Sequence, residues 1–119
     1  MRIVPSDIGK GAYFGISVAI DDDVMVVGTI FPINDGEECQ GHAYVYRQNA
    51  ITWIEETKLT PPDDSDSEEF GISVSVKDNT IVVGDWAYGD NDEGAVFVYG
   101  YDSSSISWNQ VGDTLLNDD

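Results

Sequence analysis

"FGISVAIDDDVMVVG" fills residues 14–28, and "FGISVSVKDNTIVVG" fills residues 70–84. The two stretches are identical at nine of their fifteen positions, at an offset of 56 residues. Most of the differences are mild, such as Ile20 against Val76. The chain therefore contains an internal repeat, and the length of this repeat is the first guide to the fold.

The repeat extends on both sides of these stretches. "GHAYVYR" at residues 41–47 matches "GAVFVYG" at residues 94–100, and Trp53 matches Trp108. Small differences in length between the matched blocks belong in loops, which tolerate them. The 119 residues thus divide into parts of about 56 residues, which are a first unit at residues 3–58, a second unit at residues 59–114 and the start of a third at residues 115–119.

Each unit contains four strand-like runs and no sustained 3.6-residue apolar period. In the first unit, residues 14–20 alternate bulky apolar and small side chains, which is typical of a strand. Residues 24–28 are nearly all apolar, as in a strand buried on both faces. Residues 43–46 are rich in valine and tyrosine, and residues 53–59 are polar enough for an outer edge. This pattern predicts an all-β fold with two four-stranded antiparallel blades of a β-propeller and essentially no helix.

The charge of the chain limits its partners. Asp and Glu total 23 while Lys and Arg total 5, and the net charge is −18. Such a surface repels nucleic acid and anionic membranes, and it favours cations and basic partners. No apolar run is long enough to cross a bilayer, and the N-terminal residues contain no apolar signal segment. We therefore expect no nucleic-acid partner and no direct membrane insertion.

The blocks "FGISV", "VVG" and "GHAYVY" or "GAVFVY", in this order, resemble the FG-GAP repeat family. That family is known from the head propellers of integrin α-subunits and from many extracellular multidomain proteins. Residues 14–15 and 70–71 match the FG element, whereas residues 28–29 and 84–85 depart from the Gly-Ala-Pro that usually follows. The resemblance implies an FG-GAP-like propeller segment over residues 1–119. It also implies a non-enzymatic recognition or scaffold module of an extracellular or cell-surface protein, which binds protein or glycan partners.

Calcium-binding members of this family carry an Asp-rich loop between the first two strands of the repeat. Here the corresponding loops, residues 21–23 and 77–79, are too short to supply the six or more oxygen ligands that Ca²⁺ prefers. Other acidic loops are weak candidates for a Ca²⁺ site, with a solvated loop as the alternative; their candidate ligands are Asp63, Asp64, Asp66, Asp90 and Asp92. Binding there would make the chain a calcium-dependent adhesion module, which is the main alternative function.

Two aromatic residues stand apart from the repeat. Trp86 and Tyr88 lie in a loop that has no matching aromatic pair in the first unit, so they are candidates for a partner-facing surface. Trp53 and Trp108 recur and are interpreted as structural, because most aromatic residues at strand spacing belong to a core. A hydrolase using two carboxylates is a third class, but the sequence singles out no such pair. We therefore expect no catalytic residue and no certain cofactor.

The number of units predicts that the ring is incomplete. Propellers close with about four to eight blades, whereas this sequence encodes two units and the start of a third. Each blade needs neighbours on both faces to cover its apolar side chains. We expect further blades or self-association to provide them, and three copies would give a six-bladed ring.

Overall fold

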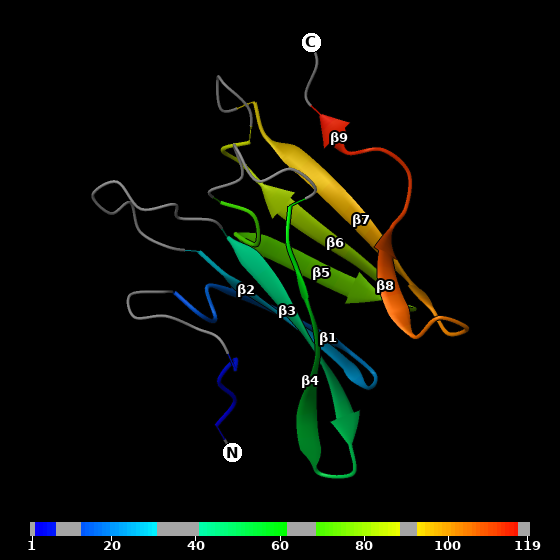
Figure 1. Ribbon diagram of the computed structural model, residues 1–119. Coiled ribbons are helices and arrows are strands. Elements are labelled where there is room, and N and C mark those ends of the chain that lie inside the picture. Colours follow the sequence, from blue (N-terminus) through cyan, green and yellow to red (C-terminus); the bar gives the residue numbers. More distant parts are fainter. Residues whose placement is uncertain (1, 7–12, 31–40, 62–68, 89–92, 117–119) are drawn as a thin grey trace.

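The computed structural model describes residues 2–6, 13–30, 41–61, 69–88 and 93–116, and these residues form two antiparallel β-sheets without a helix (Figure 1). The strands are β1 (Ser17–Asp21), β2 (Val24–Thr29), β3 (His42–Asn49), β4 (Thr52–Leu59), β5 (Ser73–Lys77), β6 (Thr80–Asp85), β7 (Ala95–Asp102), β8 (Ser107–Gln110) and β9 (Leu115–Leu116). The expected all-β fold with two repeated sheets is confirmed.

The first sheet has the order β1-β2-β3-β4 and the second has the order β5-β6-β7-β8. Short β9 also pairs with β7, where Leu115 lies opposite Val96. In the first sheet the end of β4 holds the same place, since Leu59 lies opposite Ala43. The second sheet therefore builds its outer edge from two strands, β8 and β9, where the first sheet uses β4 alone. The two sheets pack against each other, and the strands that the structure describes do not close into a ring (Figure 1).

The Phe-Gly pairs form turns and not the first residues of a strand. Gly15 has φ +94° and Gly71 has φ +99°, which is the left-handed region that favours glycine. In the first unit, the Ile16 amide donates to the Tyr13 carbonyl oxygen and closes the turn. The first strand of each unit consequently begins at Ser17 or Ser73, three residues later than the alternating pattern indicates.

The hairpin turns that follow these first strands lie next to each other. Asp78 and Asn79 both have positive φ and join β5 to β6 in the two-residue geometry that matches strand twist. Asp22 has positive φ in the β1–β2 turn. One Asp21 carboxylate oxygen accepts a 2.8 Å hydrogen bond from the Asp78 amide. The innermost strands β1 and β5 are therefore neighbours, as expected for adjacent blades.

The main core fills the space between the two sheets. Side chains alternate along each strand, so one face of the first sheet meets one face of the second. Phe70 and Phe97 pack edge to face at 5.1 Å between ring centroids. The first sheet contributes Val24, Val26, Ala43, Val45 and Leu59, and the second contributes Phe70, Val76, Ile81, Val83, Ala95, Phe97, Tyr99 and Trp108.

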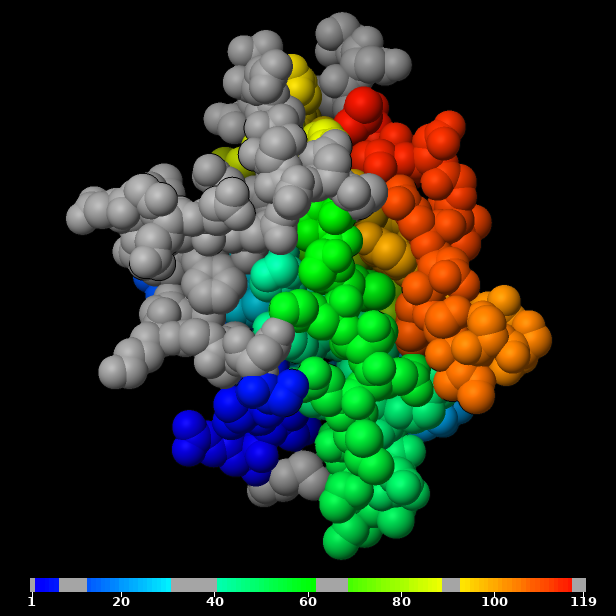
Figure 2. Space-filling model, in the orientation of Figure 1, coloured from blue at the N-terminus to red at the C-terminus, as the bar shows by residue number. Residues whose placement is uncertain are grey.

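A smaller cluster covers the other face of the first sheet. Val27, Tyr44 and Tyr46 are buried there beneath partly buried neighbours that include Ile3 and Phe14. The N-terminal segment lies beside β4 (Figure 2), and Ser6 donates from its amide and its hydroxyl to the Glu55 carboxylate. The far face of the first sheet is thus covered over β2 and β3, whereas Val18 and Ile20 of β1 remain exposed.

The second sheet is covered on one face by the described residues. Ile81 and Val83 of β6 are buried, but Val82 between them is only half-buried. The expectation that the second strand of each unit is buried on both faces therefore holds for β2 and is wrong for β6. The physical reason is that the far face of the second sheet has no sheet stacked on it in the described part of the chain.

The two sheets are in close backbone contact at the Phe70-Gly71 turn. Ser17 Oγ donates a 2.8 Å hydrogen bond to the Gly71 carbonyl oxygen. A β-carbon added at Gly28 would collide with that same oxygen, and one added at Gly41 would collide with the Phe70 carbonyl oxygen. The repeated glycines thus form a notch in the first sheet that receives the Phe-Gly turn of the second.

Candidate functional site

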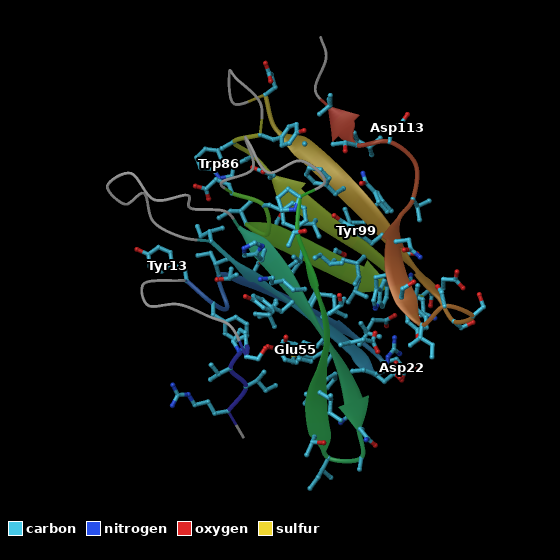
Figure 3. All side chains as sticks on the ribbon, viewed as in Figure 1. Tyr13, Asp22, Glu55, Trp86, Tyr99 and Asp113 are labelled. Atoms are coloured by element: carbon cyan, nitrogen blue, oxygen red, sulfur yellow. The ribbon has the colours of Figure 1, made fainter. Side chains whose placement is uncertain are left out.

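A pocket of about 500 Å³ opens at the end of the second sheet where β6 ends and β7 begins. Its wall combines small, apolar and acidic residues, namely Ser73, Gly84, Trp86, Glu93, Val96 and Leu115. Trp86, which lines the pocket, lies at the opposite end of the sheets from Asp22 (Figure 3). This hollow combines apolar surface with the exposed aromatic side chain of Trp86.

Trp86 stands at the rim of this pocket because the chain turns directly after β6. The Asp85 side chain is buried at the end of that strand, and its Oδ1 accepts a 3.1 Å hydrogen bond from the Ala87 amide. This local turn is a common role of aspartate. The Gly94 amide donates to the Tyr88 carbonyl oxygen and fixes the other side of the loop. The indole of Trp86 remains 66% exposed.

Tyr88 takes a different position from Trp86. Its ring packs edge to face against Phe97, with 5.6 Å between the ring centroids. It is half-buried and lies against the main core. Of the two aromatic residues named from the sequence, only Trp86 presents most of its surface to solvent.

The acidic residues named as Ca²⁺ candidates, Asp63, Asp64, Asp66, Asp90 and Asp92, lie outside the described residues. Within the described ranges, no group of three or more His, Cys, Asp or Glu side chains is arranged to hold a metal ion. Weak Ca²⁺ binding therefore stays a prediction from the sequence.

A second, polar hollow of about 460 Å³ lies at the hairpin turns. Its lining includes Asp21, Asp22, Asp23, Asp78 and Arg47. Arg47 Nη1 lies 3.2 Å from Asp23 Oδ2, so part of this acidic surface is neutralised within the protein. The hollow is a polar, mainly acidic surface and offers little apolar area for a partner.

Arg47 also forms a clamp between the sheets that the sequence did not indicate. Its guanidinium binds the Glu56 carboxylate at 2.7 and 3.1 Å, and it lies 4.7 Å from the ring centroid of Tyr101. Glu56 in turn accepts a 2.8 Å hydrogen bond from Trp108 Nε1. The available signal was a difference inside the repeat, because Gly100 stands where the first unit has Arg47.

The charges in this clamp support each other. The hydrogen bond to Glu56 raises the pKa of Arg47 further above its usual value. Burial alone would raise the pKa of Glu56, but the hydrogen bonds from Arg47 and Trp108 outweigh it and lower that pKa. The clamp is therefore ionised at neutral pH and holds the sheets together.

The stacked, repeated sheets with adjacent inner strands define a pair of β-propeller blades. The family model of the FG-GAP repeat matches residues 1–46 and 53–99. The chain therefore belongs to the FG-GAP repeat family, in agreement with the resemblance read from its sequence. No curated protein and no solved structure matches the chain. Among the described residues, no helix is long and apolar enough to span a membrane.

Proposed function

We propose that this chain is a non-enzymatic recognition module of a larger extracellular or cell-surface β-propeller, and that it binds a protein partner carrying positive charge. FG-GAP repeats indicate a propeller-type module, often with a role in extracellular binding, and the family is generally non-enzymatic. The observation that carries the proposal is Trp86, a large aromatic side chain that is two-thirds exposed at the rim of a pocket.

The chemistry of the site favours a basic protein surface. Trp is enriched among the residues that contribute most to protein–protein binding, because it buries a large, rigid surface. Glu93 is exposed beside the same pocket, and the net charge of −18 attracts positively charged partners over a distance. Together these features provide an apolar anchor within an attractive field.

The proposal is tested by probing an array of Lys/Arg-rich peptides and neutral glycans with the labelled chain. We expect binding to the basic peptides, and Trp86→Ala should weaken it by about tenfold or more. Ile51→Ala is the matched control, because Ile51 is also exposed but lies in the β3–β4 turn, away from the pocket. It should leave the affinity unchanged.

Ionic strength separates the two ligand classes. Binding of a basic peptide should weaken as salt rises, since screening shortens electrostatic attraction to within about 10 Å at 0.1 M salt. Salt-independent binding to glycans would instead assign Trp86 to stacking on a sugar. Equal affinities of Trp86→Ala and the unmodified chain would exclude Trp86 as the contact residue.

A further inference from the structure

The face of the second sheet that packs against the first sheet has an equivalent face in the first sheet. Phe70, Phe97 and Trp108 lie on this face and belong to the main core. Their repeat equivalents are Phe14, Tyr44 and Trp53, which form part of the cluster on the far face of the first sheet. The far face of the first sheet therefore has the same kind of surface that the second sheet uses for stacking. Ile3 of the same chain packs against this surface near Tyr44, whereas Ile20 of β1 leaves 61% of its surface exposed. We name this far face of the first sheet the head face.

The face of the first sheet that packs against the second sheet also has an equivalent, which lies on the second sheet. Ala43 and Leu59 of the first sheet are 0% and 5% exposed because the second sheet covers them. Their equivalents in the second sheet, Val96 and Leu115, are 36% and 57% exposed. These two residues lie on the far face of the second sheet, which we name the tail face. The tail face repeats an interface surface of the first sheet but lacks its cover.

The glycine-lined notch is part of this repetition. In the first sheet, Ser17, Gly28 and Gly41 receive the Phe70-Gly71 turn. The equivalent residues of the second sheet are Ser73, Gly84 and Gly94, and all three line the pocket of about 500 Å³. A β-carbon at Gly84 would meet only atoms of Ser73. The pocket is thus the second sheet's copy of the notch, without a turn inside it.

A turn of the matching shape lies on the head face. The Gly15 amide donates to the Gly28 carbonyl oxygen at 3.0 Å, just as the Gly71 amide donates to the Gly84 carbonyl oxygen at 3.1 Å. Both glycines share a left-handed φ near 95°. A β-carbon at Gly71 would lie 2.5 Å from the His42 carbonyl oxygen, whereas one at Gly15 would have no described atom within 4 Å. The Phe14-Gly15 turn is already formed and accessible.

We propose that two copies of this chain associate head to tail, with the Phe14-Gly15 turn of one copy seated in the Ser73–Gly94 pocket of the next. Ser73 Oγ then donates to the Gly15 carbonyl oxygen, as Ser17 Oγ donates to that of Gly71 within one chain. The occupant is a second copy because the head face carries a turn whose shape and residues match those that fill the equivalent notch within one chain. The two faces differ, so the contact is heterologous, and repeating it gives a ring where the rotation between copies closes and a filament where it does not.

This inference goes beyond the Trp86 proposal. Trp86 lies at the rim of the pocket, but the head-to-tail contact depends on the notch and on the apolar strands below it. The two proposals also respond to salt in opposite ways. Copies with a net charge of −18 repel one another, so screening strengthens self-association, whereas it weakens binding to a basic partner.

Sedimentation of the full chain at rising salt and protein concentration tests the inference. We expect a species heavier than the 13.0 kDa monomer, with a population that increases with salt. Two variants each block one face. Ile20→Lys places a charge on the head face, where Ile20 is 61% exposed and its equivalent Val76 is 9% exposed. Val96→Lys places a charge on the tail face.

Each variant alone should be monomeric, and an equimolar mixture should give a species of twice 13.0 kDa. The mixture retains one intact head face and one intact tail face, which is enough for a single junction. Both substitutions make the chain less negative, so lost association cannot result from stronger repulsion. Ile51→Lys is the control, because it adds the same charge in the β3–β4 turn and should assemble as the unmodified chain does.

Two results would overturn the inference. A chain that remains monomeric at high salt and at the highest attainable concentration would leave the tail face to a blade outside this sequence. A mixture that remains monomeric, while the unmodified chain associates, would exclude the head-to-tail geometry. Circular dichroism checks that each variant is folded, because a folded variant should give the same strand signal as the unmodified chain.

Discussion

Gly28 shows at the scale of one residue how the distance between the blades is set. The residue lies at the end of β2, where its missing side chain leaves room for the Gly71 carbonyl oxygen. Ser17 uses the same space to donate a hydrogen bond to that oxygen. Gly84 has the same local surroundings in the second sheet, but it faces the pocket. Gly28 therefore allows the second sheet to approach, whereas its equivalent Gly84 lines an open pocket.

We expect Gly28→Ala to lower the free energy of unfolding by about 3 kcal/mol, because the new methyl group would push the two blades apart. Gly84→Ala is the matched variant and should cost less, about 1 kcal/mol, since only the rotatable Ser73 hydroxyl must move. Urea denaturation of both variants measures the difference. Equal costs would show that the contact between Gly28 and Gly71 does not limit the approach of the sheets.

At the scale of an element, a β-bulge in strand β4 strengthens the contact between the two sheets. Its pairing with β3 shifts register between Val45 and Tyr46, where Glu55 and Thr57 are the paired residues on β4. Glu56 between them is left outside the ladder, as in a β-bulge. Its carboxylate thereby reaches both Arg47 and Trp108. The bulge places one acidic group where it ties β3, β4 and the second sheet together.

The pH dependence of stability should report on this carboxylate. The pKa of Glu56 is lower in the folded chain, so its stabilising effect is present above the unfolded pKa near 4.5 and is lost as the pH falls through the folded value. At neutral pH, Glu56→Gln should lower the free energy of unfolding by about 1–2 kcal/mol, because the charged hydrogen bonds are weakened. This difference from the unmodified chain should shrink below about pH 4.5.

Chemical denaturation at several pH values measures that difference directly. Asp113→Asn is the control, since it removes one negative charge at an exposed position at the β8–β9 connection (Figure 3). Its effect should be small at neutral pH. A Glu56→Gln penalty that stays constant down to pH 3 would contradict an ionised clamp.

The repeated elements could be predicted from the sequence because local patterns determine them. Alternation of apolar residues, the short hairpin turns and the repeat of about 56 residues all act within a few strands. The difference between β2 and β6 could not be predicted, because burial of Val26 and Val82 depends on what lies across the sheet. The contact between Tyr88 and Phe97 likewise could not be predicted, because the first unit has no aromatic residue equivalent to Tyr88. The Arg47 clamp could not be predicted either, because it occurs in one unit and the prediction relied on features that occur in both.

The whole molecule combines a compact pair of sheets with a strong negative charge. The Cα radius of gyration is 14.1 Å, while acidic residues exceed basic ones by 23 to 5. Repulsion among these charges acts against the compact state. Arg47 is one of the few basic residues available to offset it, and it already has two carboxylate partners.

We therefore expect salt to stabilise the fold. Raising ionic strength from about 0.01 M to about 0.15 M shortens the screening length from about 30 Å to about 8 Å. A gain of about 1 kcal/mol would raise the melting temperature by about 4 °C. Scanning calorimetry of Ile20→Lys separates this effect from association, because the result should not depend on protein concentration. A melting temperature that falls with salt would show that repulsion is not the dominant long-range term.

The two unlike faces have an evolutionary consequence. Duplication of a gene segment that encodes about 56 residues yields a new blade with a glycine notch on one face and a Phe-Gly turn on the other, because the copied unit already has both. Lengthening the array thus needs no new surface, and the loop that bears Trp86 can differ between the units while Phe-Gly, Ser and Gly recur in both. A mutation that distorts the Phe-Gly turn of one unit also leaves the notch of the neighbouring unit without its partner. Selection would then act on each junction between units and not on separate repeats.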